Sequence, residues 1–287
     1  MQSNNVGVVG AGMMGTEIAL CFACAGCRVV LYDIDSARVD DALARQRAIL
    51  AKSVEKGTLG AEQAQEAMAN MAGARNLREF ADCDLVIEAV AEELSVKHDI
   101  FRELAAVCRA DALFATNTSS ISITSVAGAL ERQRAANFVG MHFFSPAFRM
   151  KLVEVIPGEG TSDAAVARAM DAVKLIGKEP VVVKDVAGFM VNRMLNIFFI
   201  EAIRLLEEGV ASKEDIDKAC KLALGHPVGP IELLDITGLD LNLRVHSVLH
   251  EEYGERFRPR PMLKRKVAAG KFGKKNGEGF YAYKGGA

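Results

Sequence analysis

Short apolar runs alternate with longer stretches of helical periodicity from the N-terminus to residue 184. Seven runs have the length and the β-branched or apolar character of strands, at residues 6–9, 28–31, 85–90, 113–116, 138–143, 151–156 and 180–183. Alternation of strands and helices is typical of a doubly wound, mostly parallel sheet. We therefore predict an α/β fold with a Rossmann-like domain over residues 1–184.

The pattern changes after residue 184, where the strand-like runs stop. Helical segments are expected at residues 189–208, 213–222, 231–249 and 261–269. We predict an all-helical C-terminal domain over residues 185–287.

The pair Asp35-Ser36 opens an unusually long predicted helix. Its apolar stripe consists of Val39, Leu43, Leu50 and Val54. A separate basic line, formed by Arg45, Lys52 and Lys56, lies roughly 150° away around the helix. This line is either a solvated helix face or a surface that meets an anionic ligand, and the periodicity does not decide between them.

The charge balance limits the choice of partners. The 287 residues include 35 basic and 37 acidic side chains, and the isoelectric point is near 6.3. Such a protein does not as a whole attract nucleic-acid phosphates or anionic lipids. No apolar run reaches the roughly 18 residues of a transmembrane helix, and residues 1–5 lack the basic region and cleavage site of a signal peptide. We expect a cytoplasmic protein with no nucleic-acid or membrane partner.

Three of the six cysteines, Cys21, Cys24 and Cys27, have the spacing of a cluster motif. They follow a glycine motif on what is predicted to be one helix, and no fourth ligand follows at ferredoxin spacing. We interpret them as small buried helix residues and expect no metal.

The N-terminal strand leads into a G-x-G-x-x-G motif and then a helix. Gly10 permits the tight turn, Gly12 lets the backbone approach a pyrophosphate, and Gly15 allows close packing of helix and strand. The backbone amides of Met13 and Met14 would face the phosphates at the positive end of the helix. This context predicts a dinucleotide site.

Asp33 ends the next strand, where an acidic side chain accepts hydrogen bonds from a ribose 2′-hydroxyl and repels a 2′-phosphate. The sequence therefore favours NAD over NADP as the cofactor. Arg28 and Arg38 flank this region, so the preference need not be absolute.

A histidine and a carboxylate follow in the last part of the predicted sheet. His142 ends one strand, and Glu154 lies in the next, on the same face as Leu152 and Ile156 by the alternation of strand side chains. An unpaired carboxylate on an apolar face costs several kcal/mol, which a histidine partner would relieve. A base oriented by a carboxylate is what the oxidation of an alcohol by a nicotinamide needs.

Two polar patches fit the same chemistry. Residues 117–120 follow a predicted strand at the edge where open α/β sheets bind ligands. Asn192 is placed near the start of an otherwise apolar helix. Each patch is either a simple turn or cap or part of the site.

Together these stretches resemble the L-3-hydroxyacyl-CoA dehydrogenases, especially the short bacterial 3-hydroxybutyryl-CoA dehydrogenases, over nearly the whole chain. The matching segments are the glycine loop and residues 117–120, 142–146, 150–154, 188–193, 225–230 and 277–281. The resemblance implies that His142 is the general base and Glu154 its orienting partner. It also implies that Ser119 and Asn192 hydrogen-bond the reacting oxygens of the substrate.

The same resemblance implies further binding residues. Those expected around NAD are Glu92, Lys97, Ser119, Ser145 and Lys275. Lys52 and Lys56 are expected near the CoA moiety of an acyl-CoA substrate, and the helical domain is expected to form a homodimer. The implied reaction interconverts (S)-3-hydroxyacyl-CoA and 3-oxoacyl-CoA, with 3-hydroxybutyryl-CoA and acetoacetyl-CoA as the expected pair.

One departure from the family leaves the substrate open. Arg149 stands where most members carry a small apolar residue, on a segment expected to border the acyl pocket. Its side chain either turns to solvent or pairs with an anion, which is a protein carboxylate or the distal carboxylate of a dicarboxylyl-CoA such as 3-hydroxyadipyl-CoA. The sequence also leaves open a sugar-acid dehydrogenase of the same superfamily and a crystallin-like dinucleotide-binding protein without activity.

Overall fold

The computed structural model describes residues 4–283 and divides the chain into two compact units, Met1–Val186 and Ala187–Ala287. The division falls just after residue 184, where the strand-like pattern of the sequence ends. Within the described residues, no helix is both long and apolar enough to cross a membrane.

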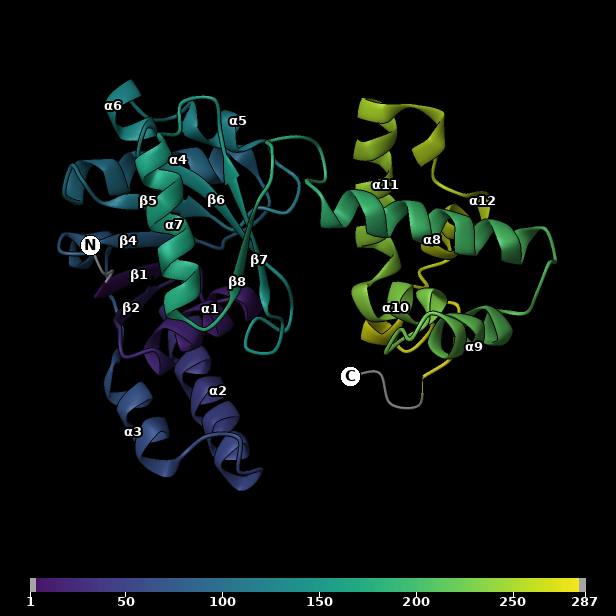
Figure 1. Cartoon of the computed structure of the whole chain (residues 1–287), viewed down its shortest axis with the longest axis horizontal. Coiled ribbons are helices and arrows are strands. Elements are labelled where there is room, and N and C mark those ends of the chain that lie inside the picture. The colour runs from purple at the N-terminus through teal and green to yellow at the C-terminus, as the bar shows by residue number, and fades with distance from the viewer. Residues whose placement is uncertain (1–3, 284–287) are drawn as a thin grey trace. The chain divides into compact units, whose positions relative to one another are not determined.

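The first unit is built on an eight-stranded sheet (Figure 1). Its strand order is β3-β2-β1-β4-β5-β6-β7-β8, and neighbouring strands are parallel except for β6 and β7. The strands are β1 (Asn5–Val9), β2 (Arg28–Tyr32), β3 (Met71–Gly73), β4 (Leu85–Glu88), β5 (Leu113–Thr116), β6 (Phe138–Phe143), β7 (Leu152–Pro157) and β8 (Glu179–Val182). This arrangement confirms the predicted doubly wound, mostly parallel sheet. The pattern missed β3, which has only three residues and a partly exposed surface.

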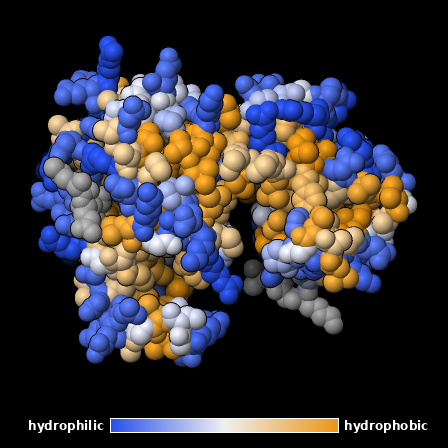
Figure 2. Space-filling model, in the orientation of Figure 1, coloured by the Kyte–Doolittle hydropathy of each residue, from blue (hydrophilic) through white to orange (hydrophobic). Residues whose placement is uncertain are grey.

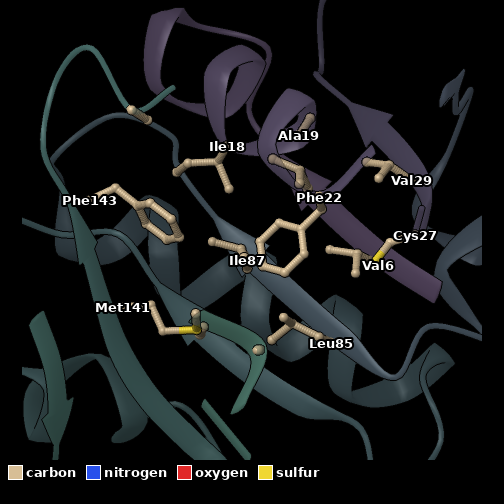
Figure 3. Close-up of a cluster of buried hydrophobic side chains, with 14 of the residues drawn as sticks. Val6, Ile18, Ala19, Phe22, Cys27, Val29, Leu85, Ile87, Met141 and Phe143 are labelled. Carbon is tan, nitrogen blue, oxygen red and sulfur yellow. The ribbon is translucent and has the colours of Figure 1, made fainter. Parts of the chain in front are cut away.

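Helices cover both faces of this sheet. They are α1 (Met13–Cys24), α2 (Ser36–Glu55), α3 (Ala61–Ala69), α4 (Leu94–Val107), α5 (Ile123–Ala127), α6 (Arg132–Ala135) and α7 (Asp163–Leu175), with the 3₁₀ turn η1 (Leu77–Phe80). Helices α1 and α7 share one core cluster with the strands, and Figure 3 shows Ile18 and Phe22 of α1 among the side chains of β1 and β4. On the other face, Phe101 of α4 packs against Phe114 and Phe138, with ring centroids 5.8 and 4.8 Å apart.

The cysteines near the end of α1 differ from expectation. Cys24 is the last residue of the helix and is exposed, whereas Cys27 is buried but lies beyond the helix. The interpretation as buried helix residues is therefore wrong for both. The helix ends here because Gly26 adopts a left-handed φ of 84°, which turns the chain into β2.

The second unit is helical, as predicted. It contains α8 (Val191–Glu207), α9 (Lys213–Ala223), α10 (Pro230–Thr237), α11 (Leu239–Tyr253), α12 (Pro261–Ala268) and the 3₁₀ turns η2 (Glu255–Phe257) and η3 (Lys274–Asn276). The single helix expected at residues 231–249 is wrong, because Gly238 has a φ of 97° and separates α10 from α11. After the break, the Leu239 amide donates to the carbonyl of Phe272 at 3.0 Å, outside the helix.

A buried carboxylate attaches the C-terminal segment to this unit. Asp235 is fully buried and accepts hydrogen bonds from the amides of Phe280 and Tyr281, both at 2.8 Å. A Cβ at Gly279 would lie 2.1 Å from an Asp235 carboxylate oxygen, so this position requires glycine. The glycine-rich segment at residues 277–281 is thus explained by packing within the helical unit.

Candidate active site

His142 and Glu154 meet across the antiparallel pair β6 and β7. The two residues are direct partners in the strand register, and the distance from His142 Nδ1 to Glu154 Oε2 is 2.7 Å. His142 is 5% exposed and Glu154 is fully buried. Because side chains directly opposite in antiparallel strands lie close together, the contact predicted from the strand alternation is present.

The hydrogen bond selects the tautomer of the histidine. When Nδ1–H donates to the carboxylate, the neutral ring carries its lone pair on Nε2. Nε2 is then the atom that can accept a proton, and the buried carboxylate can stabilise the positive charge that follows. The ring of Phe144 packs beside the imidazole, with centroids 4.5 Å apart. The pair has the geometry of an oriented acid–base group.

The glycine loop between β1 and α1 has the close approaches expected of a dinucleotide site. Gly10 has a φ of 104°, and a Cβ at Gly15 would lie 1.8 Å from the carbonyl oxygen of Gly10. A Cβ at Gly12 would meet nothing within 4 Å, so the loop is open at this point. Helix α1 starts at Met13, which is 63% exposed. The first-turn amides and the open loop fit a cofactor pyrophosphate.

Asp33, just after β2, ties this loop to the next strand. Its Oδ2 accepts a hydrogen bond from the Ala11 amide at 2.8 Å, and its Oδ1 accepts one from the Asp35 amide at 3.1 Å. At the same residue, Arg45 Nη2 donates to the Ala11 carbonyl at 2.9 Å. Arg45, the first residue of the predicted basic line, thus holds the glycine loop.

A buried ion pair lies at the end of β4, the strand that pairs with β1 in the sheet. Lys97 is 1% exposed, and its Nζ lies 2.8 Å from Glu88 Oε1 and 3.2 Å from Glu92 Oε2. Glu88, the last residue of β4, also accepts a hydrogen bond from Thr116 Oγ1 at 2.6 Å. Glu88 was not predicted as a site residue, although a carboxylate in an apolar strand run was the signal that identified Glu154.

Glu92 organises the loop that carries Ser119. Its Oε1 accepts hydrogen bonds from Thr118 Oγ1 at 2.6 Å and from the amides of Ser119 and Ser120 at 2.9 and 3.0 Å. Burial would raise the pKa of Glu92, but the Lys97 ammonium and the hydrogen bonds from Thr118 and Ser119 outweigh burial and lower it. Glu92 is therefore a carboxylate at neutral pH, and the loop after β5 is fixed by it.

Lys52 and Lys56 line a cleft with a volume of about 610 Å³, here called the α2 cleft. Its walls are the end of α1, the second half of α2, residues 58–59, the loop between β6 and β7, and residues 176–178. The lining residues are Leu20, Cys21, Cys24, Ile49, Leu50, Lys52, Ser53, Lys56, Thr58, Leu59, Phe148, Arg149, Ile176 and Lys178. The structure thus brings together the two lysines of the basic line and Arg149.

Comparison with known proteins decides the family. Residues 5–186 match the model for the NAD binding domain of 3-hydroxyacyl-CoA dehydrogenase, and residues 188–283 match the model for its C-terminal domain. The chain belongs to the 3-hydroxyacyl-CoA dehydrogenase family. Like other 3-hydroxyacyl-CoA dehydrogenases, it is an NAD-dependent oxidoreductase.

Relatives of this dehydrogenase cover nearly its full length. The 3-hydroxybutyryl-CoA dehydrogenase of Bradyrhizobium diazoefficiens is 43% identical over 281 residues, which is 98% of this chain and 95% of that protein. The human mitochondrial hydroxyacyl-coenzyme A dehydrogenase is 42% identical over 292 residues, 98% of this chain and 91% of that protein. The crystal structure of (S)-3-hydroxybutyryl-CoA dehydrogenase from Ralstonia eutropha has a TM-score of 0.94 at 39% identity, covering 99% of this chain and all of that one.

Two residues implied by the resemblance to the dehydrogenases lie in the second unit. Asn192 is in the first turn of α8, where its carbonyl accepts a hydrogen bond from Asn196 Nδ2 at 2.7 Å. Lys275 is in η3, and its Nζ lies 2.6 Å from Asp240 Oδ1. This ion pair with Asp240 was not foreseen from the sequence.

Ser145 is exposed on the loop after β6, in the first unit, which also carries His142. Backbone contacts on both sides hold this loop: the Ala147 amide donates to the Glu17 carboxylate, and Lys178 Nζ donates to the carbonyls of Ala147 and Met150. Burial raises the pKa of Glu17, against the hydrogen bond from Ala147 and the Lys178 charge. Neither Glu17 nor Lys178 was predicted from the sequence, because each contact joins segments far apart in the chain.

Proposed function

We propose that the protein catalyses the NAD-dependent interconversion of (S)-3-hydroxyacyl-CoA and 3-oxoacyl-CoA, with 3-hydroxybutyryl-CoA and acetoacetyl-CoA as its substrate pair. The observation that carries the proposal is the buried contact of 2.7 Å between His142 and Glu154. The 3-hydroxybutyryl-CoA dehydrogenases among the relatives support the short acyl chain.

In the oxidation, His142 Nε2 accepts the proton of the substrate's 3-hydroxyl group. Glu154 holds the ring through Nδ1–H and stabilises the charge on the imidazolium. The chemistry that NAD supplies when bound is acceptance of a hydride from the carbon that bears this 3-hydroxyl group. In the reverse direction the imidazolium returns its proton to the oxygen as the hydroxyl forms.

The reacting oxygens need hydrogen-bond donors as their charge develops. We assign this role to Ser119 and Asn192. Ser119 follows β5 at the carboxyl edge of the sheet, and its loop is fixed by Glu92. A fixed donor is worth more than a mobile one, because no reorganisation is needed when charge appears.

The glycine loop and Asp33 of the first unit support the proposed contacts with NAD. The amides of Met13 and Met14 face the pyrophosphate, and Asp33 accepts the ribose hydroxyls while it also holds Ala11. Around the nicotinamide half we place Glu92, Lys97, Ser145 and Lys275. Lys97 acts through Glu92, since its ammonium is buried between Glu88 and Glu92.

The CoA end of the substrate is placed at Lys52 and Lys56. Both side chains are exposed, and both line the α2 cleft. Exposed lysines attract phosphate groups as point charges. In this proposal the ligand of Lys52 and Lys56, two residues of the basic line, is the CoA moiety of the substrate.

The helical unit forms a homodimer in this proposal, and the protein acts in the cytoplasm. The unit exposes large apolar side chains, among them Leu222 at 77%, Leu224 at 61% and Met194 at 60%. Figure 2 shows hydrophobic residues at the surface of this unit. Exposed apolar groups of this kind mark interaction surfaces.

The test is a substrate panel followed by the absorbance of NADH and NADPH. We expect acetoacetyl-CoA to be reduced with the highest kcat/KM and NADH to be preferred over NADPH. Oxidation of a sugar acid such as L-gulonate without activity on any CoA thioester would move the protein to the sugar-acid dehydrogenases. Binding of NADH without turnover of either class would make it a non-enzymatic dinucleotide-binding protein.

A further inference from the structure

The α2 cleft collects positive charge from separate elements of the chain. Lys52 and Lys56 come from α2, Arg149 from the loop between β6 and β7, and Lys178 from the residue before β8. The residues that line the cleft include no aspartate or glutamate. Cations that converge on a concave surface raise the local concentration of anions there.

One of these cations has a structural task. Lys178 is 7% exposed, and its Nζ donates to the carbonyl oxygens of Ala147 and Met150. The amides of Arg149 and Met150 in turn donate to the Pro146 carbonyl at 2.9 and 3.0 Å. The backbone of Arg149 is thus held in place, and its side chain is presented at the cleft from a fixed position.

The other three cations lack a protein anion. Within residues 4–283, the side chains of Lys52, Lys56 and Arg149 make no ion pair or hydrogen bond with the protein. Some exposed cations of the same unit have such a partner, for example Arg102 with Asp99 at 2.8 Å, whereas others, such as Arg47 on α2, have none among the described residues. Three unpaired cations around one cleft repel each other, and a ligand with several negative charges would relieve that repulsion.

We propose that Arg149 binds a phosphate group of CoA together with Lys52 and Lys56, and that it does not bind the acyl chain. This inference rests on the proposed CoA thioester substrate. A guanidinium binds phosphate through two parallel hydrogen bonds, which a lysine cannot do.

The position of Arg149 argues against a distal acyl carboxylate as its partner. The reacting carbon of the substrate must lie at His142, because the hydroxyl proton passes to that ring. Neither His142 nor Glu154 belongs to the lining of the α2 cleft, whereas both lysines do. Arg149 therefore belongs to the CoA end of the substrate, and it increases affinity for CoA thioesters of any acyl chain.

The test uses Arg149→Met, which keeps an unbranched apolar stem and removes the charge. Arg47→Met is the matched control, because Arg47 is exposed on α2 and does not line the cleft. The Kd of free CoA is measured by calorimetry for both variants. The KM and kcat are measured with acetoacetyl-CoA, 3-oxoadipyl-CoA and acetoacetyl-pantetheine, which lacks all the phosphates that the proposal assigns to the cleft.

We expect Arg149→Met to raise the Kd of CoA and the KM of both CoA thioesters by the same factor, about fivefold to tenfold at low salt. The kcat values and the KM of acetoacetyl-pantetheine should not change, and Arg47→Met should behave as the wild type. Repeating the calorimetry with 3′-dephospho-CoA identifies the phosphate. If Arg149→Met no longer raises the Kd when the ligand is 3′-dephospho-CoA, Arg149 binds the 3′-phosphate. If the rise in Kd remains, Arg149 binds the diphosphate.

A rise in KM for 3-oxoadipyl-CoA alone would overturn the inference in favour of a distal carboxylate. An unchanged Kd of CoA would overturn it in favour of a solvated side chain. The proposed function fails separately: a wild-type protein that binds CoA through Arg149 but does not reduce acetoacetyl-CoA would keep the phosphate site and lose the reaction.

Discussion

Replacement of Glu154 by glutamine changes one charge and almost no volume. The carboxylate is fully buried and lies 2.7 Å from His142 Nδ1. Unit charges about 4 Å apart interact by about 4 kcal/mol at an effective dielectric constant of about 20, and a neutral hydrogen bond to the amide retains about 1 kcal/mol. The imidazolium formed during the reaction is thus destabilised by about 3 kcal/mol, and kcat should fall by about two orders of magnitude.

The assay is the steady-state oxidation of (S)-3-hydroxybutyryl-CoA by NAD at saturating substrates, the direction in which the imidazolium forms. The Kd of NADH should stay near the wild-type value, because the substitution leaves the glycine loop and Asp33, which bind the cofactor in this proposal, unchanged. Glu179→Gln is the matched control, since Glu179 is an exposed carboxylate on the neighbouring strand β8. If Glu154→Gln folds normally and keeps kcat within about threefold of the wild type, the reasoning that couples the carboxylate to the imidazolium is refuted.

Three further predictions concern other parts of the molecule. Asp33→Ser should reduce the preference for NADH over NADPH by about tenfold in kcat/KM, because it removes a ribose acceptor and a charge that repels the 2′-phosphate; a wild type that prefers NADPH would contradict this role. Lys52→Ala and Lys56→Ala should each raise the KM of acetoacetyl-CoA by about threefold at low salt, and by less at high salt because exposed charges are screened; a KM unchanged by both would return the lysines to a solvated face. Burial lowers the pKa of His246 from 6.5 to about 4, so the unfolded chain binds this proton more readily and the free energy of unfolding should fall by about 3 kcal/mol as the pH drops from 6.5 to 4. Denaturant titrations of wild type and His246→Leu should show this loss in the wild type alone, and equal losses in both would exclude His246 as its cause.

The sequence predicted most of what depends on local periodicity. Alternation along β7 placed Glu154 on a buried face, and the cost of an unpaired carboxylate there made His142 its expected partner. The antiparallel register of β6 and β7 brings the two residues together. The glycine loop was predicted in the same way, because each of its glycines answers a local steric demand, such as the 1.8 Å approach at Gly15. A structural requirement that acts between residues close together in the sequence can therefore be predicted from the residue pattern.

Contacts between distant segments were not predicted. Arg45 has the helical position of a surface residue, yet its side chain reaches the Ala11 carbonyl, 34 residues away in the sequence. The ion pair of Glu88 with Lys97 depends on how α4 lies against β4, which periodicity does not describe. The break at Gly238 also escaped, because the apolar pattern continues through it while the Leu239 amide bonds to the Phe272 carbonyl.

The most direct test of the account is the turnover of His142→Ala, measured together with NADH binding. His98→Ala serves as the control, because His98 is a partly exposed histidine of the same unit that bonds the Ser125 carbonyl. We expect His142→Ala to reduce acetoacetyl-CoA roughly two to four orders of magnitude more slowly than the wild type, with an unchanged Kd for NADH. A turnover within about tenfold of the wild type, with NADH still bound, would contradict the assignment of His142 as the base.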